Sequence, residues 1–217
     1  RLRKHMFVDE LKWDIPHNAT MEMDQYDTPM AQYSLVLRDG KVVGGARAMA
    51  TTSTWGSHTY MLRDAFSGKL PHIPPEVMTI EIASPAVWEC TRIVISDELT
   101  TAAERAECME HIIDGVVSIT RAHGADQVIG LSSVALMRWL RGLGYPVGRI
   151  GEPYRNGEDG RQYAVLHMPA EYSKAWKARE AAEHPFLRSG DWLNDAGPVP
   201  AANLIQLPTQ PQMAMSA

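Results

Sequence analysis

Cysteine is scarce in this chain of 217 residues, which contains only Cys90 and Cys108 and no CxxC motif. Such usage is typical of a reducing compartment, so we expect a cytoplasmic protein without structural disulfides. Long apolar runs are also missing, and none approaches the ~20 residues that a membrane-spanning helix needs. The net charge of −5 gives no basis for general nucleic-acid binding through phosphate neutralisation.

Several motifs of catalysis and cofactor binding are absent as well. The eight histidines show neither HxH nor HExxH spacing, so we expect no metal site. There is no GxSxG motif for a nucleophilic serine, and no glycine-rich phosphate loop of the P-loop or dinucleotide-binding kind. Any chemistry must therefore come from other residues.

The composition, 45% apolar and 22% charged, is typical of one globular domain. Alternating and apolar runs predict strands over residues 33–39, 42–49, 87–95, 126–131 and 162–167. Helices are predicted near residues 60–66, after a capping box at 101–104, after a cap at Ser132 or Ser133, and over about 170–183. This order describes an α/β sandwich with a mixed sheet. We expect one domain over residues 1–184 and a proline-rich C-terminal extension over residues 185–217.

Charged side chains interrupt two of these strands: Arg47 in the run 42–49, and Glu89 and Arg92 in the run 87–95. Burying such charges is costly unless each meets an opposite charge or a ligand. A buried ion-pair network and a substrate site both satisfy that requirement. Since Glu89 and Arg92 are three residues apart, a regular strand places them on opposite faces. For both to reach one site, we expect a β-bulge between them.

The stretch Glu22-Met23-Asp24-Gln25-Tyr26-Asp27 carries three carboxylates within six residues and has no helical periodicity. Phe7 and Trp13 precede it, and an aromatic face beside carboxylates suits a sulfonium or ammonium cation. Two alternatives stay open: both rings belong to the core, and the carboxylates pair with Arg47 and Arg92.

Together these motifs resemble the signature of the LuxI-type acyl-homoserine-lactone synthases, which reads R-x-x-x-F, W, E-x-D-x-[FY]-D, a strand arginine and E-x-[ST]-R. The matching positions are Arg3-Lys4-His5-Met6-Phe7, Trp13, Glu22-Met23-Asp24-Gln25-Tyr26-Asp27, Arg47 and Trp88-Glu89-Cys90-Thr91-Arg92. They cover residues 3–92 in order, whereas the C-terminal half matches only in its succession of strands and helices. Members of this family usually begin upstream of the first motif, so we expect N-terminal sequence before Arg1.

The resemblance implies a fold similar to that of the GNAT N-acyltransferases: a three-layer α/β/α sandwich with a mixed, mostly antiparallel central sheet. It implies that the amine of S-adenosylmethionine attacks an acyl thioester carried by acyl carrier protein or by coenzyme A. The methionyl carboxylate then closes onto the γ-carbon. This step expels methylthioadenosine and leaves an N-acyl homoserine lactone, a quorum-sensing signal. No metal or prosthetic group is implied.

The resemblance also implies roles for individual residues. Seven are expected at the S-adenosylmethionine site: Arg3, Phe7, Trp13, Asp24, Asp27, Arg47 and Arg92. The ammonium must lose a proton before it attacks, which requires a positioned carboxylate, directly or through water. Glu89 is the first candidate for this base, with Glu22 and Asp24 as alternatives. Arg47 and Arg92 are expected to keep those carboxylates ionised.

For the acyl chain, the resemblance implies a tunnel between the strands at 87–95 and 126–131. The candidate lining residues are Ile129, Gly130, Leu136, Met137 and Trp139, and core packing is the alternative for each. Gly130 stands where this family often has a threonine that accompanies 3-oxoacyl chains. An unsubstituted or 3-hydroxy chain is therefore expected.

An acidic acyl carrier protein needs a basic surface on its partner. Residues 127–151 contain Arg138, Arg141 and Arg149 and no acidic residue, so we expect docking there, with simple solubility as the alternative. Two other functions stay open. One is a GNAT-like N-acyltransferase that acylates another amine from acyl-coenzyme A, although the phosphate-cradling Gln/Arg-x-x-Gly-x-Gly/Ala loop of such enzymes is absent. The other is a binding protein without turnover.

Overall fold

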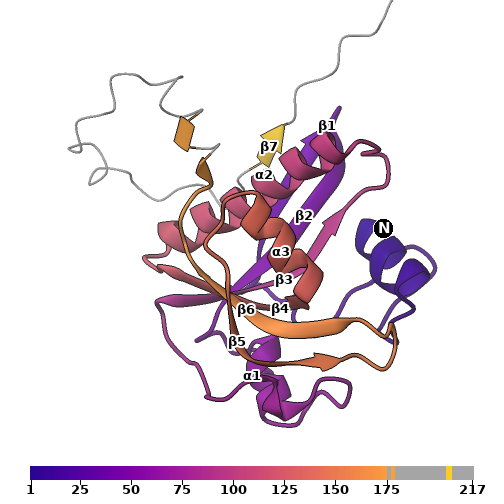
Figure 1. Cartoon of the computed structure of the whole chain (residues 1–217). Coiled ribbons are helices and arrows are strands. Elements are labelled where there is room, and N and C mark those ends of the chain that lie inside the picture. The colour runs from indigo at the N-terminus through magenta and orange to yellow at the C-terminus, as the bar shows by residue number, and fades with distance from the viewer. Residues whose placement is uncertain (175–176, 179–203, 207–217) are drawn as a thin grey trace, which may run out of the picture.

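One sheet of seven strands, in the order β5-β6-β4-β3-β2-β1-β7, organises the computed structural model of the chain (Figure 1). The structure describes residues 1–174, 177–178 and 204–206. The strands are β1 (Gln32–Arg38), β2 (Lys41–Ala50), β3 (Val87–Ile95), β4 (Gln127–Ser133), β5 (Gly148–Arg155), β6 (Gln162–Pro169) and β7 (Leu204–Gln206). The pairs β3–β4 and β1–β7 are parallel and the other neighbours are antiparallel. The expected mixed, mostly antiparallel sheet is confirmed.

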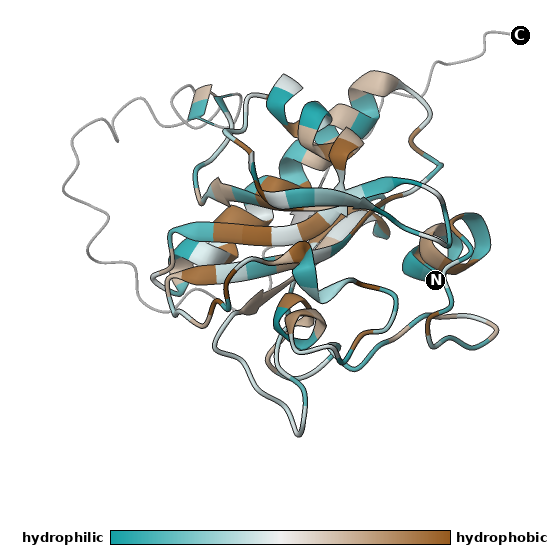
Figure 2. Cartoon of the chain, turned by 60° about the horizontal axis from the view of Figure 1, so that its bottom comes forward, coloured by the Kyte–Doolittle hydropathy of each residue, from teal (hydrophilic) through white to brown (hydrophobic). Residues whose placement is uncertain are grey.

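Helices cover both faces of this sheet. The helices α2 (Ala102–Ala122) and α3 (Val134–Gly142) lie on one face and α1 (Met61–Phe66) lies on the other, as Figures 1 and 2 show. The 3₁₀ turn η2 (Pro75–Val77) contacts α1 and β5, and the π-helix η1 (Lys4–Glu10) lies beside the sheet. The three-layer α/β/α arrangement is thus confirmed. Among the helices that the structure describes, none combines the length and apolar character required to cross a membrane.

Apolar side chains fill the interfaces on both faces. Ile112 and Val116 of α2 pack with Leu166 of β6 on one face. On the α1 face, Leu62 belongs to a second cluster that includes Val165 of β6. Consecutive residues of β6 therefore enter opposite cores, as the two-residue period of a strand requires. The sheet is buried on both sides, so any passage through it must arise from a gap between strands.

Such a gap opens between β3 and β4. These strands pair only over their first residues, from Val87 opposite Gln127 to Glu89 opposite Ile129. Beyond that point β3 continues along β2, whereas β4 continues along β6. Gly130 permits the last close approach, because a Cβ there would lie 2.3 Å from the carbonyl oxygen of Cys90.

A β-bulge interrupts β3 where the sequence requires one. Gly45 pairs with Val94 and Arg47 pairs with Thr91, so one residue of β2 opposes two residues of β3. Arg92 adopts the left-handed conformation, with φ of 56°. The extra residue resets the alternation of side chains, so that Arg92 follows Glu89 and Thr91 onto the α1 face. The expected bulge is confirmed.

The expected strands are all present, as are α1, the capping box of α2 and Ser133 as the N-cap of α3. The sequence does not predict β5, whose two glycines and one proline are typical of a loop. Residues 170–173 are not helical, and most of the remaining length of the helix expected over 170–183 lies outside the described residues. The extension over 185–217 also lies outside them, apart from Leu204–Gln206.

Candidate active site

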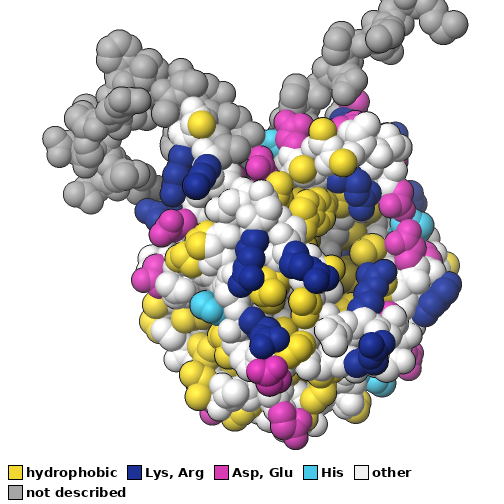
Figure 3. Space-filling view, viewed as in Figure 1, with side chains coloured by type: hydrophobic (Ala, Val, Ile, Leu, Met, Phe, Trp, Pro, Cys, Tyr) yellow, Lys and Arg dark blue, Asp and Glu magenta, His cyan; other side chains and the backbone are white. Residues whose placement is uncertain are grey.

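A cavity of about 800 Å³ occupies the gap between β3 and β4. Its walls come from the N-terminal segment, β3, β4, β6, α2 and α3. It reaches both faces of the sheet, since Met109 of α2 and Ile73 on the α1 side both line it. The space-filling view in Figure 3 shows a hollow in the surface of the protein, with hydrophobic side chains inside it and basic side chains around its rim. The residues at its two ends differ sharply in character.

Six charged side chains meet at one end, and we call them the acid–arginine cluster: Arg3, Glu22, Asp24, Asp27, Arg47 and Arg92. Arg3 donates from Nε to Glu22 at 2.6 Å and from both terminal nitrogens to Asp27 at 2.6 and 2.8 Å. Arg47 donates to Asp24 at 2.5 Å and to Asp27 at 3.0 Å. Arg92 donates to Asp24 at 2.7 Å and to Glu22 at 3.3 Å. Three carboxylates are thus matched by three guanidinium groups.

The cluster is buried, and its members keep one another charged. Arg47 is only 1% exposed. Burial raises the pKa of Asp24, but the hydrogen bond from Arg47 and the charge of Arg92 outweigh it, and the pKa falls below its ordinary value. Burial likewise opposes ionisation of Asp27, and the hydrogen bonds from Arg3 and Tyr33 bring its pKa far below normal. Asp24 and Asp27 are therefore ionised at neutral pH.

Three carboxylates this close together also resemble a metal site. One oxygen from each of Glu22, Asp24 and Asp27 lies within 4.8 Å of the others. The three arginines already supply positive charge to all of them, so the cluster is balanced without an ion.

Only part of the acid–arginine cluster faces the cavity. Asp24 and Arg92 line it, whereas Arg3, Glu22, Asp27 and Arg47 stand behind them. All three nitrogens of the Arg3 side chain are engaged by Glu22 and Asp27. Arg3 thus holds the carboxylates in place from outside the cavity.

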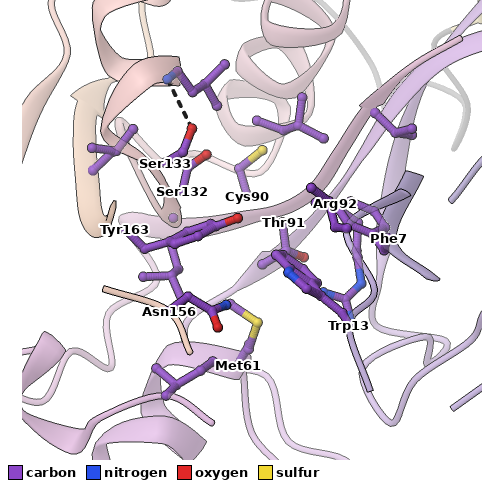
Figure 4. Close-up of a pocket in the computed structure, with 18 of the residues that line it drawn as sticks. Phe7, Trp13, Met61, Cys90, Thr91, Arg92, Ser132, Ser133, Asn156 and Tyr163 are labelled. Carbon is purple, nitrogen blue, oxygen red and sulfur yellow. Dashed lines mark hydrogen bonds between the residues drawn. The ribbon is translucent and has the colours of Figure 1, made fainter. Parts of the chain in front are cut away.

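Phe7 and Trp13 form an aromatic wall next to Arg92 (Figure 4). Their rings stack with centroids 5.1 Å apart, and the Arg92 guanidinium lies 5.2 Å from the Phe7 centroid and 5.9 Å from that of Trp13. The indole N–H of Trp13 donates to Asp159 at 3.2 Å, and Asp159 also accepts from Tyr163 at 2.7 Å. The loop between β5 and β6 thereby fixes the wall.

Glu89 lies 3% exposed on the α1 face of β3, outside the cavity wall. Its two carboxylate oxygens accept the backbone N–H groups of Met61 (2.9 Å) and Leu62 (2.8 Å) at the start of α1. Burial raises the pKa of Glu89 to about 7, although these two hydrogen bonds and the charge of Arg47 oppose the rise. The pKa of Glu89 thus lies near neutrality, whereas that of Asp24 is lowered. Of the three candidate bases, only Asp24 lines the cavity.

The other end of the cavity is apolar. Of the five residues expected along the acyl chain, Ile129, Gly130, Leu136 and Trp139 line it. Met137 does not line it, although it packs against the same core cluster as Leu136 and Trp139. Ser132, Ser133 and Cys90 lie on this side in Figure 4, and the Ser133 hydroxyl is occupied by the N–H of Leu136.

The three arginines expected to bind a carrier protein are all exposed. Arg138 and Arg141 lie on α3, and Arg149 lies on the neighbouring β5. Arg141 donates to the carbonyl of Val147 at 2.7 Å, and Arg149 approaches Glu152 at 3.4 Å.

Sequence reasoning misses several contributors to the site. Thr91 accepts a hydrogen bond from Arg47 at 3.0 Å and lines the cavity, and the E-x-[ST]-R motif already carries this signal. Tyr33, the second residue of β1, donates to Asp27 at 2.6 Å, but a tyrosine in a strand gives no signal by itself. Asp159 lies in a loop far along the chain, where no motif marks it.

The fold and the cavity define a class: a GNAT-like acyltransferase whose sheet opens between its central parallel strands. Comparison with known proteins makes this more specific. Residues 1–177 match the family model of the autoinducer synthases. The chain belongs to this family, and it is an acyl-homoserine-lactone synthase, as the motifs indicated.

Individual relatives support this assignment. The acyl-homoserine-lactone synthase of Acinetobacter nosocomialis is 31% identical over 159 residues, which cover 70% of this chain and 80% of the relative. That of Ralstonia solanacearum is 33% identical over 156 residues, which cover 69% and 70%. Among solved structures, TofI in a ternary complex with an inhibitor and MTA is 28% identical, with a TM-score of 0.62 over 78% of this chain and 80% of that chain. BjaI, a CoA-dependent acyl-homoserine lactone synthase solved with SAM and isopentyl-CoA, is 17% identical and supports the fold alone, with a TM-score of 0.64 over 94% of this chain and 82% of that chain.

Proposed function

We propose that this chain makes an N-acyl homoserine lactone from S-adenosylmethionine and an acyl thioester, and releases methylthioadenosine. The observation that carries the proposal is the two-ended cavity. One end offers the Asp24 carboxylate, the Arg92 guanidinium and an aromatic wall to a substrate with a sulfonium, an ammonium and a carboxylate. The other end offers an apolar wall to an acyl chain, and the gap between β3 and β4 joins the two.

The residues divide the chemistry between them. Asp24 faces the cavity and offsets the ammonium, Arg92 holds the methionyl carboxylate, and Phe7 and Trp13 contact the sulfonium and adenosyl groups. Glu89 takes the proton from the ammonium through water, since its pKa lies near 7 whereas that of Asp24 is lowered. The free amine attacks the thioester carbonyl, and the thiol leaves. The methionyl carboxylate oxygen then attacks the γ-carbon, the carbon–sulfur bond breaks, and neutral methylthioadenosine departs.

We further propose acyl carrier protein, rather than coenzyme A, as the acyl donor. The start of α2, where a GNAT enzyme would cradle a pyrophosphate, carries acidic side chains in this chain. Its capping box occupies the N–H groups of Thr101 and Glu104. Asp97 and Glu98, both exposed, add negative charge beside it. The exposed arginines of α3 and β5 suit an acidic carrier protein instead.

Mass spectrometry of an organic extract from cells that express the chain tests the reaction. We expect a lactone that disappears with Glu89→Gln, because loss of a general base costs about 10²–10⁴-fold in rate. The exposed Glu98→Gln serves as the matched control and should leave the yield unchanged. The spectrum also names the acyl chain, for which Gly130 predicts no 3-oxo group. Undiminished lactone from Glu89→Gln would refute the assignment of the base, and no lactone from the unaltered, S-adenosylmethionine-binding protein would refute the function.

The donor is tested with purified protein and two thioesters of the same acyl chain. We expect turnover with the carrier-protein thioester to fall when salt is raised or when Arg138→Glu is introduced, because both weaken charge attraction between exposed surfaces. Turnover with the coenzyme A thioester should respond to neither. Equal efficiency with both donors, unaffected by Arg138→Glu, would contradict the proposed docking.

A further inference from the structure

Asp64 is a buried acid that the reaction described above does not use. It is fully buried within α1 and accepts hydrogen bonds from four side chains. The donors are Thr59 Oγ1 at 2.8 Å, Tyr26 Oη at 3.1 Å, His58 Nδ1 at 3.1 Å and Lys69 Nζ at 3.1 Å. The backbone N–H of Thr59 also donates to it, at 3.2 Å. A buried carboxylate with this many partners holds several segments of chain together.

The segments joined by Asp64 are those around Glu89. Thr59 precedes the backbone N–H groups of Met61 and Leu62 by two and three residues, and these groups supply both hydrogen bonds to Glu89. Asp64 lies one turn further along the same helix, and its N–H donates to the carbonyl of Tyr60. The Asp64 carboxylate thus binds the chain just before the N–H groups of Met61 and Leu62, and Asp64 itself lies just after them.

Two hydrogen-bond partners of the same carboxylate, Tyr26 and Lys69, line the substrate cavity. Tyr26 belongs to the acidic stretch, and its ring lies 5.6 Å from the guanidinium of Arg47. Burial raises the pKa of Asp64, but the hydrogen bonds from Thr59, Lys69 and His58 lower it below its ordinary value, so Asp64 is an anion at neutral pH.

We propose that Asp64 is a positioning residue, which fixes the start of α1 so that two backbone N–H groups hold Glu89 for proton transfer. This role rests on the proposed function of Glu89 as the base. Without the anion, the α1 donors loosen, the Glu89 carboxylate loses stabilisation of its charged form, and its pKa rises further.

Other charges act on Glu89 as well, and the experiment must keep them constant. Arg47 on β2 favours its ionised form, and Asp24 in the acidic stretch opposes it. Tyr26, Tyr60 and Cys90 also face it, but burial raises the pKa of each of these groups, to about 12 for Cys90. None of the three ionises near pH 7. Asp64 is itself an anion, and the direct effect of removing its charge would be to lower the pKa of Glu89. A rise of that pKa in Asp64→Asn therefore reports the loss of positioning by the α1 backbone.

The test is a carboxyl ¹³C NMR titration of Glu89, assigned by loss of its signal in Glu89→Gln. In Asp64→Asn, we expect the midpoint to rise by at least about half a unit. Asp114→Asn is the matched control, because Asp114 is an equally buried aspartate on the opposite face of the sheet, bonded to Tyr145 and Ser173. It should leave the midpoint in place. An unchanged midpoint in folded Asp64→Asn, or an equal rise in Asp114→Asn, would overturn the proposal.

Thr59→Val covers the case in which Asp64→Asn does not fold. It removes only the hydroxyl donor at 2.8 Å, so we expect a smaller rise in the same direction, and Thr59→Ser should restore the original midpoint. No rise with Thr59→Val would overturn the proposal in that case.

The rate of lactone formation, measured against pH on the same variants, distinguishes the role of Glu89 as the base from the positioning role of Asp64. A midpoint that shifts in the NMR titration, while the acid limb of the rate profile stays fixed, would refute Glu89 as the base and leave the positioning role intact. We expect both to move together, with a rate at pH 7 that is about twofold lower in Asp64→Asn for a rise of half a unit.

Discussion

The two ends of the cavity are specified in different ways. In the acid–arginine cluster, each guanidinium contacts two different carboxylates, so the identity of each residue matters. At the apolar end, Ile129, Leu136 and Trp139 contribute surface, and the decisive feature is the path of the backbone where β3 and β4 separate. Residue identity therefore encodes one end, and backbone geometry encodes the other.

Breaking the cluster should have the largest effect. Arg47→Met leaves Asp24 and Asp27 buried with one cation fewer, so we expect a loss of about 3–5 kcal/mol in the free energy of unfolding. Urea denaturation measures this loss, and lactone formation should vanish with it. Arg63→Met is the control, since its ion pair with Glu81 is exposed and should contribute about 0–1 kcal/mol. Similar losses in the two variants would mean that the buried cluster contributes no more to stability than an exposed ion pair does.

The pH dependence of stability tests Glu89, which lies outside the cavity wall and belongs to neither end. Its pKa is raised from 4.5 to about 7 in the folded chain, so folding favours the protonated form. This contribution to stability is fully present below pH 4.5 and is lost as the pH rises through about 7, a change on the order of 3 kcal/mol. Glu89→Gln should flatten that slope in urea titrations between pH 4.5 and 7. Activity should run the opposite way and rise with pH over the same range, because the base must be ionised.

The apolar end is tested most directly at Gly130. A Cβ at this position meets the backbone carbonyl of Cys90, which cannot move aside as a side chain would. We expect Gly130→Ala to cost about 1–3 kcal/mol in unfolding free energy and to reduce turnover of long acyl chains more than short ones. Gly142→Ala, at the end of α3 where a Cβ meets nothing within 4 Å, is the control and should be neutral or slightly stabilising. If Gly130→Ala matches it, the spacing of β3 and β4 does not depend on this glycine.

The difference between the ends also explains what the sequence can predict. Arg47, Glu89 and Arg92 stand out because buried charges in strands demand partners, and the spacing of the last two demands the bulge at Arg92. Such requirements are local and can be seen in one sequence. Met137 and Trp139 are both candidates for the wall of the acyl tunnel, yet only Trp139 lines the cavity, because which helix face meets the gap depends on packing.

The sequence predicts β5 and the loop after it least well, because their structure also depends on contacts with distant parts of the chain. β5 is an edge partner of β6 with a register shift between Ile150 and Tyr154, so its sequence shows neither alternation nor an apolar run. Asp159 follows it and supports Trp13 across 146 positions of sequence. Only the folded chain brings these two residues together, so no local pattern marks the contact.

The smallest expected effects come from one conservative substitution at each end of the cavity. Together they test whether the two ends bind their substrates independently. Trp13→Phe keeps a ring beside Phe7 and Arg92 but loses the hydrogen bond to Asp159, which is worth about 0.5–1.5 kcal/mol. We expect a severalfold higher KM for S-adenosylmethionine with kcat unchanged, because the wall shifts while the proton-transfer group stays in place. Trp139→Phe should instead leave that KM unchanged and move the preferred acyl length, since the smaller ring widens the apolar end. Steady-state kinetics with a series of thioesters measures both, and a change in the S-adenosylmethionine KM with Trp139→Phe would show that the two ends do not act independently.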